Sequence, residues 1–234
     1  MMAPATALIL AAGRGERMRP LTDDTPKPLL RVRGRRLIEW HLDALARAGV
    51  RRVVVNTAWL EEQFPAALGD GSRWGVAITY STEGREHGGA LETAGGMKKA
   101  RERLGDPFWV VSGDVYAPGF EFASAAAEAF VAGGRLGRLW LVDNPPHHAR
   151  GDFGIRDGLA AADVEPRLTW SSIGLFRAAF VDTLMTDLPP GTKAPLRPYL
   201  EAAIARRALE AERYAGPWTD VGTPQRLEAL NAAP

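Results

Sequence analysis

Two glycines and an arginine follow the first apolar run of the chain in a pattern that suits phosphate binding. Residues 10–19 read Leu-Ala-Ala-Gly-Arg-Gly-Glu-Arg-Met-Arg. Small residues let the backbone approach a polyphosphate and offer it N–H donors, which makes Gly13 and Gly15 candidate contacts. Arg17 could clamp a phosphate with two hydrogen bonds. The pattern matches neither a Walker A loop nor the dinucleotide fingerprint, and taken alone it fits a tight turn equally well.

A lysine held between two prolines follows this glycine loop. Because each proline restricts the residue before it, the sequence predicts extended, stiffened backbone at Thr25 and at Lys27. A lysine fixed in this way is a good point charge for phosphate. An isolated Pro-Lys-Pro is more often a surface turn, but this one is close enough to the glycine loop to face the same crevice.

Two aspartates stand beside glycines at the ends of expected strands. Asp114 follows Val110–Gly113, and Asp220 lies in Trp-Thr-Asp-Val-Gly over residues 218–222. Mg²⁺ prefers one or two carboxylates together with substrate phosphates and water. Each aspartate alone would indicate a turn. Together with the glycine loop, Asp114 and Asp220 are predicted to be Mg²⁺ ligands.

Alternating apolar and amphipathic segments must position these groups. The first half predicts strands at 6–10, 52–56, 76–80 and 108–112, with helices at 37–48, 60–68 and about 91–104. This alternation predicts an α/β fold, a three-layer, doubly wound, mostly parallel sheet of Rossmann-like type. Ligands of such sheets lie beyond the carboxyl ends of the strands, where the glycine loop and Asp114 are placed.

The second half is less regular. It predicts a helix at 123–132, strands at 138–142, 168–176 and 218–220, and short strands near Phe153 and Leu159. A helix should begin near Pro195 and Pro198 and run to about 208. Thr223 should cap a last helix over 224–230. With no linker or repeat evident, we expect one domain over residues 1–234.

Composition excludes several classes of function. The 234 residues carry a net charge of +1, which gives no global field for nucleic acid or a membrane surface. The absence of cysteine removes thiolate catalysis and zinc–cysteine sites and is consistent with a reducing compartment. No apolar stretch is long enough to span a membrane, and residues 1–10 lack the basic start of a signal peptide. We therefore expect a cytoplasmic protein.

Taken together, these motifs resemble the sugar-1-phosphate nucleotidyltransferase family. The matching segments are residues 10–22, Thr-Pro-Lys-Pro-Leu at 25–29, Gly-Asp-Val at 113–115 and Trp-Thr-Asp-Val-Gly-Thr at 218–223. Within the family, residues 56–60, 69–73, 91–96, 142–145, 147–148 and 150–153 are similar to the uridylyltransferases of peptidoglycan recycling. The resemblance implies UTP and a sugar 1-phosphate as substrates, N-acetylmuramate α-1-phosphate in that subgroup, with Mg²⁺ as cofactor. Oligomeric state, monomer or dimer, stays open.

The resemblance also implies roles for individual residues. Lys27 and Arg17 would be catalytic, and Asp114 and Asp220 would bind the metal. Residues about 1–115 would form a nucleotide-binding half and residues about 116–234 a sugar-binding half. The implied nucleotide contacts are Gly13, Gly15, Glu16, Arg17, Lys27, Glu83 and Ser112, with Glu83 near the base. The implied sugar contacts are Asn144, Asp152 and Ser172.

One departure from the family pattern affects the sugar phosphate. Many relatives carry a Glu-Lys-Pro stretch whose lysine contacts this group, whereas residues 164–168 here read Val-Glu-Pro-Arg-Leu. The candidate replacements for this cation are Arg150, Arg167 and Lys193.

The expected reaction is in-line attack of the sugar phosphate on the α-phosphorus of UTP, with release of pyrophosphate. A phosphate monoester is mostly dianionic at pH 7 and needs no base to become a nucleophile. Two alternatives stay open: a mannose 1-phosphate guanylyltransferase or another enzyme of this family, and a non-catalytic subunit that binds a nucleotide sugar.

Overall fold

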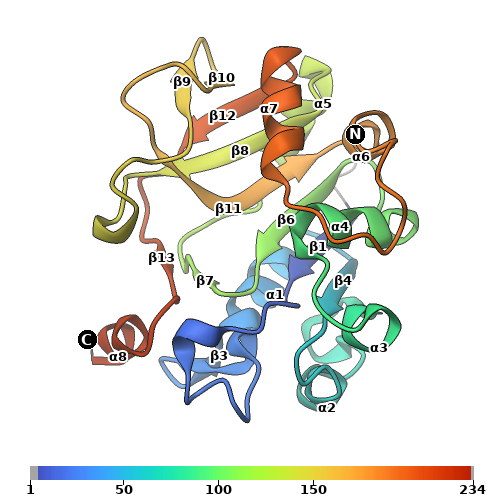
Figure 1. The fold of residues 1–234 in the computed structure, drawn as a ribbon, viewed down its shortest axis with the longest axis vertical. Helices are drawn as coiled ribbons and strands as arrows, with labels where there is room; N and C mark the ends of the chain where they lie inside the picture. The colour runs from blue at the N-terminus through green and yellow to red at the C-terminus, as the bar shows by residue number, and fades with distance from the viewer. Residues whose placement is uncertain (1–4, 233–234) are drawn as a thin grey trace.

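A nine-stranded sheet forms the centre of the computed structural model, which describes residues 5–232 (Figure 1). Its strand order is β5-β4-β1-β6-β11-β8-β12-β10-β9. The strands of this sheet are β1 (Thr6–Leu10), β4 (Arg52–Thr57), β5 (Ala77–Thr82), β6 (Phe108–Ser112), β8 (Gly137–Val142), β9 (Gly154–Arg156), β10 (Leu159–Ala161), β11 (Thr169–Phe176) and β12 (Leu209–Arg213). Strands from both halves of the chain therefore share one sheet.

Most strands of this sheet run in the same direction. β5, β4, β1 and β6 are parallel neighbours, and β12 is parallel to β8. β11 is antiparallel to both β6 and β8, and β10 is antiparallel to both β12 and β9. Only β10 and β11 thus oppose the others within this sheet. The predicted mostly parallel α/β sheet is confirmed.

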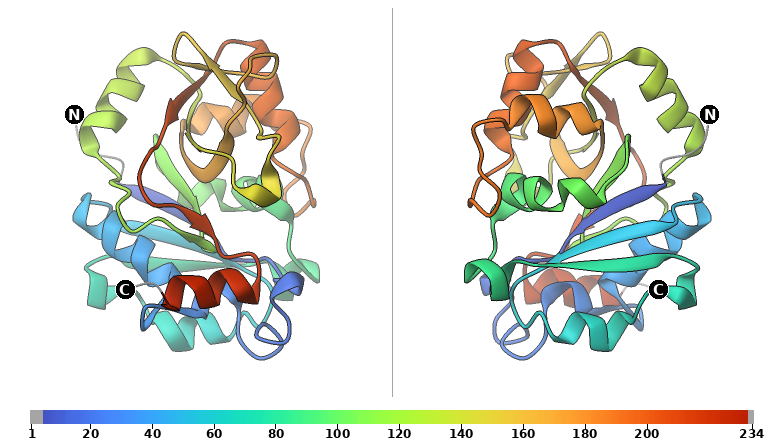
Figure 2. Two further views of the ribbon diagram at one scale, coloured as in Figure 1. Left: turned by 90° about the vertical axis from the view of Figure 1, so that its left-hand side faces the viewer. Right: turned by 90° about the vertical axis from the view of Figure 1, so that its right-hand side faces the viewer.

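Helices cover both faces of the sheet (Figure 2). Alternate residues of β1 point to opposite faces: Ala7 and Ile9 belong to one core, and Leu8 belongs to the other. The first core includes residues of α1 (Leu37–Arg47), α2 (Gln63–Leu68) and α5 (Ser124–Gly133). The second includes residues of α4 (Glu92–Ala100), α6 (Ala178–Leu184) and α7 (Arg197–Ala205). This arrangement is the three-layer, doubly wound architecture.

A third, smaller core fixes the C-terminal segment against the N-terminal one. Helix α8 (Pro224–Ala232) contributes Leu227, and the glycine loop contributes Met18. Two further residues of this core come from a small two-stranded sheet of β7 (Val115–Tyr116) and β13 (Thr219–Asp220): Tyr116 lies in β7, and Val221 follows β13. Both are buried. The last elements of the chain are thereby packed beside the first loop.

Short elements make up the remainder. A hairpin pairs β2 (Arg31–Val32) with β3 (Arg35–Arg36), and α3 (Glu83–His87) follows β5. The 3₁₀ helices are η1 (Glu16–Met18), η2 (Lys27–Leu29), η3 (Ser72–Trp74), η4 (Arg101–Arg103) and η5 (Pro146–His148).

The observed boundaries correct several expectations. The helix predicted from residue 60 begins at Gln63, because Leu60 has a left-handed φ of 47°. Helix α7 begins at Arg197, so Pro198 lies in its first turn as expected, and it ends at Ala205, before the predicted end near 208. Helix α6 and strand β12 were not predicted. The Thr223 side chain does accept a hydrogen bond from the Arg226 N–H at 3.4 Å, as expected for an N-cap.

Residues 1–4, the start of the apolar N-terminal run, lie outside the described residues. Within residues 5–232, no helix combines the length and apolar character needed to cross a bilayer.

Candidate active site

The glycine loop leaves the end of β1 and turns sharply at Gly15. Gly15 has a φ of +68°, and a Cβ there would lie 3.1 Å from Thr22 Cγ2 and 3.3 Å from Lys27 Cβ. The Thr22 hydroxyl donates to the Gly15 carbonyl at 2.9 Å, which closes the loop. A Cβ on Gly13 would meet nothing within 4 Å, so open space lies beside that residue. Of the two glycines, only Gly15 has a backbone conformation that favours glycine.

Glu16 and Arg17 lie on the exposed side of the same loop, in η1. A cleft of about 280 Å³ lies beside them, lined by Gly15, Glu16, Arg17, Met18, Lys27 and Gly222. The arginine that sequence reasoning assigned to phosphate therefore lines an open cleft together with Lys27.

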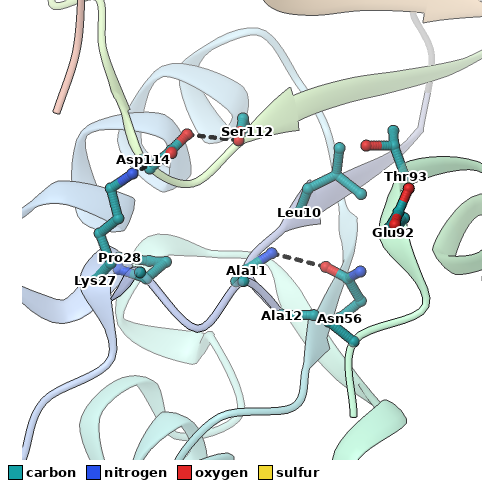
Figure 3. A pocket seen from close by; sticks show the side chains of 13 residues that line it. Leu10, Ala11, Ala12, Lys27, Pro28, Asn56, Glu92, Thr93, Ser112 and Asp114 are labelled. Carbon is teal, nitrogen blue, oxygen red and sulfur yellow. Dashed lines mark hydrogen bonds and ion pairs between the residues drawn. The ribbon is translucent and has the colours of Figure 1, made fainter. Parts of the chain in front are cut away.

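Lys27 is nearly buried, with 8% of its surface exposed, and its ammonium reaches Asp114. The Nζ–Oδ2 distance is 2.5 Å (Figure 3). The backbone at Lys27 differs from the expectation: instead of being extended, the residue opens the 3₁₀ helix η2. Hydrogen bonds from Leu29 N to the Pro26 carbonyl and from Leu30 N to the Lys27 carbonyl, at 2.8 and 3.1 Å, form that turn. Burial, rather than extended geometry, fixes this lysine.

Asp114 receives two donors at the carboxyl end of β6. The Ser112 hydroxyl donates to Oδ1 at 2.6 Å, while Lys27 donates to Oδ2 (Figure 3). Burial by itself would raise the pKa of Asp114, but the Lys27 charge and the hydrogen bonds from Lys27 and Ser112 outweigh it and lower the pKa. Asp114 is therefore an anion held in a defined orientation.

Gly113 brings the two sides of this ion pair together. Its N–H donates to the Leu10 carbonyl at 2.8 Å. A Cβ at Gly113 would lie 3.1 Å from that carbonyl oxygen and 3.2 Å from Pro28 Cβ. The absence of a side chain here allows the β6 end, the glycine loop and the Lys27–Pro28 turn to meet.

Asp220 lies next to Asp114 across the small β7–β13 sheet. It is paired with Val115, and Val221 N donates to the Asp114 carbonyl at 2.8 Å. Trp218, which immediately precedes β13, attaches it to β11, since the Trp218 indole N–H donates to the Ser171 carbonyl at 3.0 Å. This pairing holds together the backbones of the two predicted metal ligands, which are more than a hundred residues apart in sequence: Asp114 immediately precedes β7, and Asp220 lies in β13.

The Asp220 carboxylate has an arginine and a histidine beside it. Arg226 Nη1 donates to Oδ2 and lies 3.0 Å from His147 Nε2. His147 Nε2 also lies 3.0 Å from Asp220 Oδ1. Despite this approach, the buried Oδ1 has no hydrogen-bond donor among residues 5–232. Sequence reasoning missed Arg226, although it lies only six residues after Asp220.

A pocket of about 260 Å³ lies between the glycine loop and the end of β6 (Figure 3). Its lining residues are Leu10, Ala11, Ala12, Gly13, Gly15, Lys27, Pro28, Asn56, Ala90, Glu92, Thr93, Ser112 and Asp114. Lys27 lines both this pocket and the cleft beside Arg17. Gly13, Gly15, Lys27 and Ser112, all predicted nucleotide contacts, therefore share one pocket wall.

Asn56 links the pocket to the interior. Its Oδ1 accepts from Ala11 N at 2.7 Å, and its Nδ2 donates to Glu83 Oε1 at 2.8 Å. Sequence reasoning did not assign a role to Asn56, although a polar residue ending the apolar run 52–56 was a usable signal.

Glu83 is placed differently from the expectation that it lies beside the base. It is fully buried and does not line the pocket. Its Oε2 accepts from Leu91 N at 2.8 Å, and Oε1 is held by Asn56. Burial raises the pKa of Glu83, and the hydrogen bonds from Leu91 and Asn56 offset part of this rise. In this structure Glu83 therefore supports Asn56 rather than facing the pocket.

The predicted sugar contacts form a separate group along β11. Asp152 Oδ2 accepts from Trp170 N at 2.8 Å, and Ser172 lies with φ +61° at an irregularity of the strand. Asn144 donates to the Ala149 and Arg167 carbonyls at 3.1 and 2.9 Å and accepts from Thr169 at 2.8 Å. These bonds occupy both the Nδ2 and the Oδ1 atom of Asn144. Its side chain therefore holds the loop in place and leaves no amide hydrogen for a sugar hydroxyl.

The three candidate cations for a sugar phosphate have no polar contact with the two predicted metal ligands among the described side chains. Arg167 Nε is 3.3 Å from Glu165, and Lys193 Nζ is 3.6 Å from Glu92. Arg150 is exposed on the loop before Asp152. None of the three makes a hydrogen bond or ion pair with Asp114 or Asp220 among the described side chains.

The fold and the site define a class of protein that comparison also supports. A family model described as nucleotidyl transferase matches residues 6–156, and the chain belongs to that family. The chain is 44% identical to the N-acetylmuramate alpha-1-phosphate uridylyltransferase of Neisseria meningitidis serogroup B, over 97% of this chain and 96% of that protein. It is 42% identical to the protein of the same name from Caulobacter vibrioides, over 98% and 97% of the two chains.

A solved structure shows the same fold. It is that of a Bacillus anthracis protein described as a glucose-1-phosphate thymidylyltransferase and crystallised with sucrose. It superposes with a TM-score of 0.82 at 21% identity, covering 97% of this chain and 94% of that one.

Proposed function

We propose that this protein transfers a uridylyl group from UTP to N-acetylmuramate α-1-phosphate, giving a UDP-sugar and pyrophosphate in the recycling of peptidoglycan. One observation carries the proposal: Lys27 contacts Asp114, both line the pocket beside the glycine loop, and Asp220 lies in β13, which pairs with the strand that follows Asp114. The identity to two proteins named for this activity, over nearly the whole chain, selects the substrate pair. We place the reaction in the cytoplasm.

The donor set at Asp114 and Asp220 fits Mg²⁺. Within residues 5–232, no group of three or more histidine, cysteine, aspartate or glutamate side chains could hold an ion alone. Two carboxylates with one unpartnered oxygen instead leave positions for phosphate oxygens and water, which is how Mg²⁺ is commonly bound. Bound there, Mg²⁺ would supply positive charge to the phosphates of UTP.

The protein contributes to the reaction by positioning the two substrates and by neutralising their negative charge. The sugar phosphate is dianionic near pH 7, so its oxygen attacks the α-phosphorus without a general base. A new oxygen–phosphorus bond forms as the bond to the pyrophosphate oxygen breaks. Lys27 and Arg17 would balance the charge that gathers on the α-phosphate and the leaving group. Backbone N–H groups of the loop at Gly13 and Gly15 would add fixed dipoles.

The nucleoside would occupy the 260 Å³ pocket. Asn56 fixes the pocket wall at Ala11, and Glu83 holds Asn56 from behind. The sugar would lie toward Asp152 and Ser172. Ser172 is in β11, next to Ser171, whose carbonyl accepts the hydrogen bond from Trp218. The two substrates would then meet at the Lys27–Asp114 pair.

A substrate panel tests this proposal. The purified protein is incubated with Mg²⁺ and UTP or GTP, paired with the 1-phosphates of N-acetylmuramate, N-acetylglucosamine, glucose and mannose. Pyrophosphate and nucleotide sugar are followed by ³¹P NMR. We expect the highest kcat/KM with UTP and N-acetylmuramate 1-phosphate. Preference for GTP with mannose 1-phosphate would replace the proposal with the guanylyltransferase alternative. Binding of UDP-sugar without turnover of any pair would indicate a non-catalytic subunit.

A further inference from the structure

Arg226 places a guanidinium against one of the two carboxylates proposed to bind metal. The residue lies in the first turn of α8, and its side chain is 21% exposed. Its Nη1 donates to Asp220 Oδ2 and, at 3.0 Å, to the Asp220 carbonyl. The same nitrogen lies 3.0 Å from His147 Nε2, which brings α8 close to η5.

The contact has a counterpart at the other carboxylate. Lys27 neutralises Asp114 as Arg226 neutralises Asp220, so each proposed metal ligand already has one cationic partner. A carboxylate that ligates a divalent ion is neutralised by that ion. Its former partner is then a cation without a counter-ion, next to substrates that carry several negative charges. Lys27 was assigned to phosphate on sequence grounds, and the same reasoning applies to Arg226.

The rest of the guanidinium is available for such a contact. Among residues 5–232, Nε and Nη2 of Arg226 donate to no protein acceptor. Nη2 lies over Gly222, where a Cβ would be 3.0 Å away. Gly222 lines the cleft together with Arg17 and Lys27, so Arg226, although not itself a lining residue, lies directly behind that wall. Two adjacent N–H donors of an arginine suit a phosphate, because they can bind two of its oxygens at once.

We propose that Arg226 is a phosphate-binding residue of the reaction, which exchanges the Asp220 carboxylate for a substrate phosphate when Asp220 ligates the metal. The inference rests on the proposed function. Its ligand is a phosphate monoester or diphosphate, and two sources are available in the site: the sugar 1-phosphate and the pyrophosphate portion of UTP. Of the cations considered for the sugar phosphate, Arg150, Arg167 and Lys193 make no hydrogen bond or ion pair with Asp220 among the described side chains, whereas Arg226 does.

Binding without turnover tests the assignment. Arg226→Gln and the wild-type protein are titrated calorimetrically, with Mg²⁺ present, against α,β-methylene-UTP and against pyrophosphate. N-acetylmuramate and N-acetylglucosamine 1-phosphates are titrated in the presence of the non-reactive nucleotide. Loss of a charge-assisted contact should raise the Kd of the ligand whose phosphate Arg226 binds by about ten- to a hundredfold. Affinity for Mn²⁺ alone, measured by electron paramagnetic resonance, should be unchanged or higher, because a competing cation has been removed.

A matched control removes another arginine–aspartate pair. Arg177 contacts Asp106 through two hydrogen bonds of 2.7 and 2.9 Å, and Asp106 lies before the amino end of β6, whereas Asp114 follows its carboxyl end. Arg177→Gln should therefore leave all four affinities unchanged. If Arg226→Gln does not fold, Arg226→Met, which keeps the aliphatic stem, repeats the titrations.

The outcomes separate the possible sources and the alternatives. Weaker binding of sugar 1-phosphates alone supports the proposal and assigns Arg226 to that substrate. Weaker binding of pyrophosphate and nucleotide supports it and assigns Arg226 to the leaving phosphates. Wild-type affinity for every phosphate ligand overturns it, as does a fall in Mn²⁺ affinity, which would show that Arg226 only positions Asp220. Should the substrate panel reject UTP, the titrations are repeated with the pair that the enzyme uses, so the two proposals fail independently.

Discussion

Lys27 and Asp114 form an ion pair across 87 residues of sequence, with 2.5 Å between Nζ and Oδ2. The lysine side chain is 10% exposed, whereas the aspartate side chain is 33% exposed. The pair therefore has a buried side, which fixes the lysine, and an open side, which faces the pocket. This asymmetry suits a cation that must stay in place while phosphates arrive and leave.

Replacing Lys27 should abolish most activity and leave the fold intact. We expect Lys27→Ala and Asp114→Asn each to lower turnover by roughly two or more orders of magnitude, since positioned charge at a developing oxyanion has effects of this size. Pyrophosphate release gives the rate, and circular dichroism monitors folding. Lys98→Ala is the control, because Lys98 is also partly buried but donates to the Met185 carbonyl at 3.0 Å instead of to a site residue. Full activity of Lys27→Ala would refute the catalytic role.

The two glycines of the first loop should respond differently to alanine. Gly15→Ala should destabilise the protein by about 1–2 kcal/mol, because the residue has a φ of +68° and the new Cβ crowds Thr22 and Lys27. Gly13→Ala should leave stability nearly unchanged, since its Cβ meets no atom within 4 Å. If phosphates pass over the loop, Gly13→Ala should nevertheless raise the KM for UTP several-fold. Urea denaturation and steady-state kinetics measure the two effects. Equal stability of both variants would contradict the backbone argument.

His41 should make the protein sensitive to acid. It is 2% exposed, and its Nε2 is 2.8 Å from the Val115 carbonyl. Burial lowers the pKa of His41 to about 4, although the Val115 hydrogen bond and the Asp114 charge raise it. The unfolded chain binds this proton near pH 6.5 and the folded one only near pH 4, so the free energy of unfolding should fall as pH decreases between these values.

The variant that checks this is His41→Gln, whose amide can still donate to the Val115 carbonyl but does not titrate. Between pH 7.5 and 4.5 the wild type should lose roughly 2–3 kcal/mol more unfolding free energy than the variant, measured by urea denaturation at each pH. The lower overall stability expected of the variant does not affect this comparison, which uses the difference between the two pH values. Parallel losses in the two proteins would show that His41 does not cause the acid sensitivity.

Local pattern alone located most of the sheet. The apolar runs at 6–10, 52–56 and 108–112 became β1, β4 and β6, with β4 extended by one residue. Strands that are buried on both faces consist of consecutive apolar residues, and such a run is recognisable in the sequence. Strand β12 (Leu-Glu-Ala-Glu-Arg) lacked such a run, because it owes its place to pairing with β8 and not to its own composition.

The sequence by itself determined the chemistry available to this protein: a glycine loop, a lysine between prolines, and two aspartates at strand ends, in the order typical of one enzyme family. Only the tertiary structure decided which of these groups meet. It joined Lys27 to Asp114, added Arg226 and Asn56 to the site, and withdrew Glu83 into the interior. The physical reason is that motif spacing reports backbone conformation over a few residues. Contacts between groups 87 or more residues apart depend on how β6, β7 and β13 are packed, and no local pattern encodes that packing.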